Sequence, residues 1–219
     1  LANESPNKIT KIQGLVVCSS SSVETKRFSS NKFDKNLFQK LNNAENNLIS
    51  ICKKLKINLY ILRPTMIYGN IENFSDNNIS FLKKIIKNFP LILLPRDSGL
   101  RQPIHIDQLA EVTKHFVLKI IKEKDNQTSQ KILIFGGDEE LNYYQMLCSL
   151  KNKISKNSNL RNKFILRIPN NLFYFLISPI LIISPKVFES LLRIGANLSG
   201  FKSSHIITGR PKRKFPVDN

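Results

Sequence analysis

The chain has 219 residues, of which 41% are hydrophobic and 23% charged, and these ordinary fractions exclude wholesale disorder and a fibrous repeat. Lys and Arg total 34 against 16 for Asp and Glu, a formal net charge of +18. Lys, Asn and Ile, which share A/T-rich codons, are all abundant, and the basic residues are scattered. We therefore attribute the charge mainly to composition and expect no nucleic-acid partner.

Cysteines and histidines are scattered as well. Cys18, Cys52 and Cys148 form no CxxC pair, and the three histidines lie equally far apart. Zinc sites usually show closely spaced ligands, and disulfide frameworks usually use an even number of cysteines. We expect no metal site and a reducing, cytoplasmic location, with membrane association as an open alternative.

Hydrophobic patterning predicts alternating strands and helices. A β-branched run at 13–18 predicts a strand, an apolar stripe at helical spacing predicts a helix at 37–55, and 57–62 is a second strand. This order is typical of a right-handed βαβ unit in a parallel sheet. The alternation continues and indicates an α/β protein. Further along the chain we expect helices at 79–88, 106–123 and 143–154 and a strand at 131–135.

The most apolar stretch is 172–183, interrupted by Ser178 and Pro179. It is shorter than the ~20 residues that a membrane span needs. We expect a buried helix or a subunit contact, kinked at Pro179. The alternative is a contact of residues 172–194 with a membrane surface, helped by two basic residues in that segment.

Three stretches place polar residues after predicted strands or before a predicted helix. They are VVCSSSS at 16–22, ILRPTMIYG at 61–69 and LRQPIHIDQLA at 100–110. Their order and spacing resemble the extended short-chain dehydrogenase/reductases, specifically the NAD(P)-dependent epimerases and dehydratases of nucleotide sugars. The resemblance implies the C-terminal portion of a Rossmann-like, doubly wound parallel sheet with a smaller, mainly helical substrate lobe.

The resemblance also implies a domain organisation. Residues 1–70 match the C-terminal half of the NAD(P)-binding domain, and 71–219 match the substrate lobe, with 100–137 returning to the sheet. The family's Gly-rich loop, whose backbone holds the cofactor pyrophosphate, has no counterpart in the chain. We therefore expect the C-terminal two-thirds of a longer protein, or the product of a truncated gene, that alone binds NAD or NADP weakly.

Particular residues match positions with known roles in the family. Ser21, with Ser20 as the next candidate, matches the Ser or Thr that hydrogen-bonds the substrate hydroxyl during hydride transfer; the alternative is a local role in the loop. Pro64 and Thr65 match backbone that lies against the nicotinamide ring. Arg101 matches the arginine that clamps the diphosphate of a nucleotide sugar, a contact suited to a planar bidentate donor.

The family's catalytic Tyr-x-x-x-Lys pair is missing. Counting back from Glu45, a landmark of the helix after the serines, places Leu41 at the lysine and Leu37 at the tyrosine. Neither leucine transfers a proton. Lys26 is the nearby base that could substitute. Met66 or Ile67 also stands where many members that act on nucleotide sugars carry Asn.

Taken together, these features predict an NAD(P)-dependent nucleoside-diphosphate-sugar epimerase- or dehydratase-like protein whose catalytic competence depends on replacing the missing pair. The alternative is a non-catalytic dinucleotide-binding or interaction protein, resembling the dehydrogenase-like accessory subunit of respiratory complex I. A decaying fragment without activity is the third reading. A homodimer stays open for either function. His105 and Asp107 are expected to have structural roles.

Overall fold

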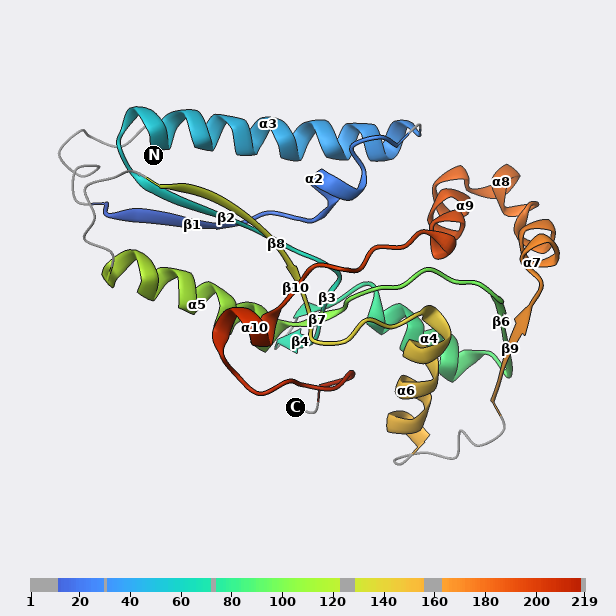
Figure 1. The fold of residues 1–219 in the computed structure, drawn as a ribbon. Coiled ribbons are helices and arrows are strands. Elements are labelled where there is room, and N and C mark those ends of the chain that lie inside the picture. Colours follow the sequence, from blue (N-terminus) through green and yellow to red (C-terminus); the bar gives the residue numbers. More distant parts are fainter. Residues whose placement is uncertain (1–11, 30, 72–73, 123–128, 156–162, 218–219) are drawn as a thin grey trace.

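A four-stranded parallel sheet forms the centre of the computed structural model, which describes residues 12–29, 31–71, 74–122, 129–155 and 163–217 (Figure 1). Its strand order is β1-β2-β8-β10, and each neighbouring pair is parallel. The predicted α/β class with a parallel sheet is confirmed. The four strands are β1 (Gly14–Cys18), β2 (Asn58–Pro64), β8 (Gln130–Gly136) and β10 (Lys202–Ser203).

Helices cover both faces of this sheet, α3 (Lys32–Lys54) on one and α5 (Ile106–Lys122) on the other (Figure 1). Successive side chains of a strand point to opposite faces. Accordingly Leu59 and Ile61 of β2 pack in the cluster that includes α3 residues. Tyr60 and Leu62 pack in the cluster that includes α5 residues. Each fully buried side chain of this kind contributes about 1.5–3 kcal/mol.

The start and the end of α3 have local causes. Asn31 precedes the helix, and its side-chain oxygen accepts a hydrogen bond of 2.9 Å from the backbone N–H of Asp34. This cap starts the helix several residues before the predicted start at 37. The helix ends at Lys54, and Lys56 has a φ of 53°, a left-handed conformation that does not continue a helix.

A second group of elements lies beyond the carboxyl ends of β1 and β2. Two further strands pair in parallel, and the helices α4 and α6 pack with them around one apolar cluster. The segment 130–136, within the predicted return to the sheet, pairs with β2; the division of the chain at residue 70 stays a prediction. The elements of the second group are β6 (Leu91–Pro95), β9 (Phe164–Ile168), α4 (Ile79–Asn88) and α6 (Tyr143–Ser155).

Short elements lie between the main sheet and the second group, and the chain returns to the main sheet near its C-terminal end. After β10, the helix α10 packs against α5. The short elements are α2 (Ser22–Thr25), β3 (Ile67–Tyr68), β4 (Asn70–Ile71), β5 (Phe74–Ser75), β7 (Ile104–His105) and α10 (Ser204–Thr208).

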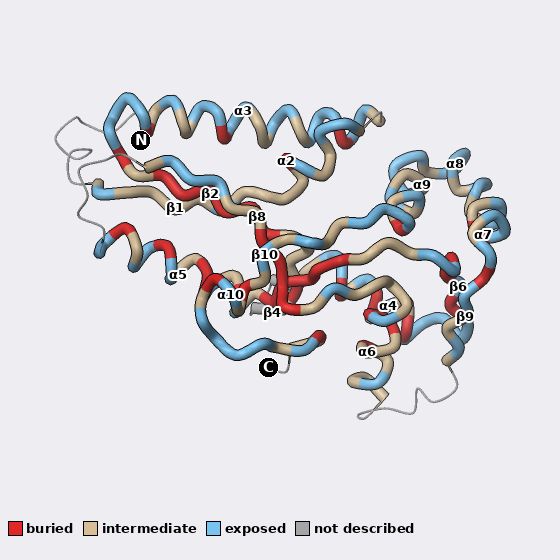
Figure 2. The backbone as a smooth tube through the Cα atoms, viewed as in Figure 1, coloured by how far each residue is buried: buried red, intermediate tan, exposed pale blue. Residues whose placement is uncertain are grey.

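The apolar stretch at 172–183 does not form the buried helix that was predicted, and the other alternative, a subunit contact, stays a prediction. It forms α7 (Asn170–Ile177) and α8 (Ile180–Ile183), which are followed by α9 (Pro185–Leu192) and a 3-10 turn, η1 (Arg193–Gly195). The break falls at Ser178 and Pro179, as the kink prediction requires. Most apolar side chains here are solvent-exposed, with Ile182 at 89% and Ile183 at 83% (Figure 2). Within the described ranges, no helix is long and apolar enough to cross a membrane.

Candidate active site

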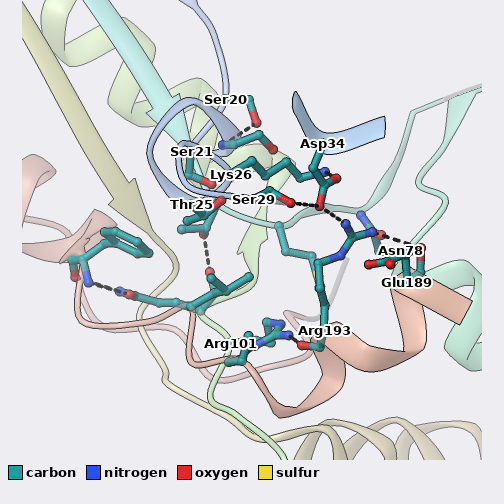
Figure 3. A pocket seen from close by; sticks show the side chains of 18 of the residues that line it. Ser20, Ser21, Thr25, Lys26, Ser29, Asp34, Asn78, Arg101, Glu189 and Arg193 are labelled. Carbon is teal, nitrogen blue, oxygen red and sulfur yellow. Dashed lines mark hydrogen bonds and ion pairs between the residues drawn. The ribbon is translucent and has the colours of Figure 1, made fainter. Parts of the chain in front are cut away.

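A cavity of about 810 Å³ lies at the carboxyl ends of β1 and β2 (Figure 3). In open parallel sheets this edge is where ligands bind. The cavity brings together five of the six residues singled out in the sequence, although they come from three separate segments. These five lining residues are Ser20, Ser21, Lys26, Thr65 and Arg101. Their chemical roles stay predictions. Their common location in the cavity is a feature of the fold.

The serine loop is fixed by the strand next to it. The backbone N–H groups of Ser19 and Ser21 donate to the carbonyls of Leu62 and Pro64 at 2.7 and 3.0 Å. The Oγ of Ser20 accepts from the backbone N–H of Ser22 at 3.1 Å, a local role of the kind weighed for this loop. The side chain of Ser21 makes no capping hydrogen bond to α2 and lines the cavity.

Behind the loop, a buried ion pair joins α3 to β2. The Nε of Arg63 donates to the two carboxylate oxygens of Glu45 at 3.1 and 3.2 Å, and its Nη2 donates to Oε2 at 2.5 Å. The Oγ of Ser19 donates to the same carboxylate at 2.5 Å. Both charged side chains are at most one-tenth exposed. The pair therefore fixes the position of α3 relative to the serine loop.

Several side chains that line the cavity contact the carboxylate of Asp34, a residue of α3. Its carboxylate accepts from Lys26 Nζ at 2.7 Å, from Asn31 Nδ2 at 3.0 Å and from the guanidinium of Arg193. Burial alone would raise the pKa of Asp34, but the hydrogen bonds from these three residues and the charge of Lys26 outweigh it and lower the pKa to about 2. Lys26 Nζ is thus held in an ion pair with Asp34, and its role as a substitute base stays a prediction.

Thr65 lies where β2, the 101–105 segment and β8 meet. Its backbone N–H donates to the carbonyl of Phe135 at 3.0 Å, and its hydroxyl donates to the carbonyl of Gln102. The buried Gln102 amide in turn donates to the carbonyls of Gly137 and Phe201 at 2.9 and 3.0 Å. Backbone and side-chain hydrogen bonds thus fix this wall of the cavity.

Arg101 lines the cavity but donates mainly to the backbone. The residue is only 4% exposed, and its terminal nitrogens donate to the carbonyls of Leu100, Ala196 and Arg193. Its guanidinium also lies over the ring of Tyr143, 5.1 Å from the ring centroid. In this arrangement Arg101 holds the 193–196 segment against the cavity.

His105 and Asp107 have the local contacts expected of structural residues. His105 is buried, and its Nδ1 accepts from the backbone N–H of Asp107 at 3.3 Å. Asp107 lies in the first turn of α5, where a carboxylate is favoured by the helix dipole. Neither residue lines the cavity.

Several cavity residues were not predicted. No motif marks them as cavity residues, and tertiary packing brings them to the cavity. For Asp34 the available signal was its place three residues after Asn31, a residue type that often caps helices. For the other residues we find no signal in the sequence. The main unpredicted residues are Asp34, Asn78, Tyr143, Glu189 and Arg193.

Comparison with known proteins gives a match in structure only. No protein-family model and no curated protein matches the chain. The UDP-glucose 4-epimerase of Thermus thermophilus, solved as a complex with NAD, superposes with a TM-score of 0.52 at 14% identity over 92% of this chain and 60% of that chain. A nucleoside-diphosphate-sugar epimerase from Staphylococcus aureus gives 0.51 at 15% identity over 92% and 62%. The chain has the fold of these epimerases.

The resemblance inferred from the three stretches is thus confirmed at the level of the fold. The chain spans 40% to 62% of the length of the epimerase structures reported among its matches. The two leucines at the predicted tyrosine and lysine positions, Leu37 and Leu41, do not line the cavity, and α3 contributes Asp34 to its wall.

The fit to a dinucleotide is partial. The carbonyl of Pro64 and the N–H of Thr65 are engaged by Ser21 and Phe135, so backbone at the predicted nicotinamide position is held rigidly. In the part of the chain that the structure describes, no glycine-rich turn joins a strand to a helix, and this turn is what holds a pyrophosphate. The same part contains no group of three His, Cys, Asp or Glu side chains placed to hold a metal ion.

Proposed function

We propose that the chain forms the substrate-binding side of an NAD(P)-dependent nucleoside-diphosphate-sugar epimerase or dehydratase. The observation that carries this proposal is that one cavity, at the carboxyl edge of a parallel sheet, is lined by Ser21, Lys26, Thr65 and Arg101. The epimerase fold supports the same assignment. Because the matched structures are proteins of substantially greater length, the complete activity is part of the proposal.

The proposed roles follow the side-chain chemistry. The hydroxyl of Ser21, with that of Ser20 beside it, would hydrogen-bond a sugar hydroxyl. Pro64 and Thr65 would border the nicotinamide ring of NAD or NADP, which supplies hydride chemistry when bound. The basic residues that line the cavity would bind the negatively charged diphosphate of the nucleotide sugar. Arg101 would shape that region through the 193–196 segment. We expect the chain alone to bind the dinucleotide weakly, because the described residues lack a pyrophosphate cradle.

Isothermal titration tests this proposal. We expect saturable binding of UDP-glucose and an affinity for NAD weaker than the low micromolar range, which corresponds to about −8 kcal/mol. Ser21→Tyr should place a bulky ring inside the cavity and weaken UDP-glucose binding at least about tenfold, or ~1.4 kcal/mol. Ser50→Tyr, at an exposed position of α3, is the matched control. Absence of UDP-glucose binding, or equal binding by both variants, would contradict the proposal.

A second candidate is a non-catalytic protein that docks on an anionic membrane surface, in line with the alternative of an accessory, dehydrogenase-like subunit. Leu37 and Leu41 at the positions of the catalytic pair favour it. The exposed apolar face of α7–α9 also favours it, with Phe175 74% exposed and Ile182 and Ile183 more so. A net charge of +18 suits an anionic surface. A homodimer through the same face is the competing outcome.

A further inference from the structure

Two cations from opposite sides of the cavity contact one carboxylate. Lys26 follows α2, and its Nζ lies 2.7 Å from Oδ1 of Asp34. Arg193 begins η1, and its Nη1 pairs with Oδ2 of the same residue. Figure 3 shows the side chain of Arg193 extending across the cavity toward Asp34. The contact therefore joins the serine loop to the segment that follows α9.

The cations reach solvent, whereas the carboxylate does not. The side chains of Lys26 and Arg193 are 20% and 34% exposed, against 6% for Asp34. All three line the cavity, together with Glu189, whose carboxylate accepts from Asn31 at 3.3 Å. A ligand that enters the cavity would meet the two cations before it met the buried carboxylate.

Arg101 and Arg193 differ in what their donors face. The guanidinium of Arg101 donates to backbone carbonyls, two of which belong to Arg193 and Ala196. The guanidinium of Arg193 donates instead to side chains, namely Asp34 and the Oγ of Ser190 at 3.0 Å. A side-chain contact can be exchanged for a ligand contact by a rotamer change, whereas moving Arg101 would break three part-buried hydrogen bonds to the backbone. Arg101 therefore positions the backbone that carries Arg193.

We propose that Lys26 and Arg193 form the anion-binding pair of this cavity, that its ligand is the diphosphate of a nucleoside diphosphate, and that Asp34 holds both cations in place while competing with that ligand. This inference rests on the proposed function and adds the residues that recognise the diphosphate. A guanidinium binds phosphate oxygens with two parallel hydrogen bonds, and an ammonium adds a compact charge beside it. Two cations match the two charged groups of a diphosphate.

Titration with UDP and with uridine tests the pair. Lys26→Gln and Arg193→Gln should each weaken UDP binding about tenfold or more, since a hydrogen bond between charged groups is lost. Lys186→Gln removes the same charge from an exposed position of α9 and should change the affinity less than twofold. Asp34→Asn removes the competing carboxylate and should tighten UDP binding several-fold. None of the four variants should change the affinity for uridine.

The outcomes separate this inference from the proposed function. If the wild-type chain binds UDP and both glutamine variants bind it equally well, the pair is wrong and the proposed function stands. If the wild-type chain binds neither UDP nor UDP-glucose, the proposed function fails and the pair falls with it. Thermal melts show whether a variant is folded. Lys26→Arg, which keeps the charge, should retain most of the affinity, whereas Arg193→Lys keeps the charge but loses the two parallel hydrogen bonds and should retain only part of it. Weaker binding by Asp34→Asn would also overturn the competition.

Discussion

At the scale of single residues, Asp34 links the stability of the cavity wall to pH. Its pKa, lowered from 3.8 to about 2 in the folded chain, means that the folded state binds the proton less well than the unfolded state. The carboxylate therefore stabilises the fold above about pH 4, and this contribution is lost as the pH falls from 4 toward 2. We expect Asp34→Asn to cost about 2 kcal/mol at neutral pH.

Urea unfolding of the wild type and Asp34→Asn across pH 7 to 2.5 measures this effect. The difference in unfolding free energy should shrink as the pH falls through 4. Asp97→Asn, at an exposed position, serves as a control and should show little difference at any pH. A constant difference between wild type and Asp34→Asn over the whole range would contradict the account.

The buried pair of Glu45 and Arg63 gives a second prediction. Glu45→Gln leaves the Arg63 guanidinium buried without its main carboxylate, and breaking such pairs costs about 3–5 kcal/mol. Glu24 contacts the same guanidinium at 3.3 Å, but its side chain is 49% exposed, so Glu24→Gln should cost at most about 1 kcal/mol. Denaturant unfolding compares the two variants at pH 7. Equal losses would show that the buried contact does not fix α3.

Single residues could be predicted from the sequence where a local pattern marked them. Ser21, Thr65 and Arg101 each belong to a short stretch next to a strand or helix end, and all three line the cavity. Glu189 and Arg193 lie in α9 and η1, after the apolar stretch, where nothing in the sequence distinguishes them from surface residues. Tertiary packing alone brings them to the cavity, so local patterns carry no signal for them.

At the scale of elements, Asp138 holds the C-terminal segment to the end of β8. Its oxygens accept from Ser204 Oγ at 2.6 Å and from the backbone N–H groups of His205 and Arg213, each at 2.9 Å. Burial would raise the pKa of Asp138, but these hydrogen bonds lower it. Asp138→Ala should therefore speed hydrogen exchange at the amides of His205 and Arg213 at least tenfold, about 1.4 kcal/mol of local stability.

The control for this prediction is Glu140→Ala. The Glu140 carboxylate accepts one exposed hydrogen bond, from the N–H of Gly200 at 3.0 Å. Its loss should leave exchange near β10 and α10 almost unchanged. Unchanged exchange in Asp138→Ala would mean that packing, rather than these hydrogen bonds, anchors the segment.

Elements with a clear period were predicted within a few residues, and short ones were missed. The helix at 79–88 coincides with α4, and the strand at 131–135 lies within β8. β10 contains only Lys202 and Ser203, too short for any period to be read. The 172–183 stretch was predicted to be a buried helix or a subunit contact because apolar residues are usually covered, and few neighbouring elements of this chain cover it. Hydrophobicity identifies what should be covered, but not what covers it.

At the scale of the whole molecule, the exposed face of α7–α9 decides between the two candidate functions. If the second candidate holds, the chain should co-sediment with vesicles that contain anionic lipid, and Ile182→Asp with Ile183→Asp should abolish this. Phe81→Asp, at an exposed position of α4, is the control. Light scattering on the same proteins detects the competing homodimer. Vesicle binding that persists in the double variant would contradict a docking role for this face.

We propose that the cavity at the carboxyl edge of the sheet binds a nucleoside-diphosphate sugar. An NMR titration of the isotopically labelled chain with UDP-glucose tests it most directly. The account predicts saturable shifts of the backbone amides of Ser21, Lys26 and Arg193, with glucose alone causing none. Absence of saturable shifts, or shifts confined to residues outside the cavity, would contradict it.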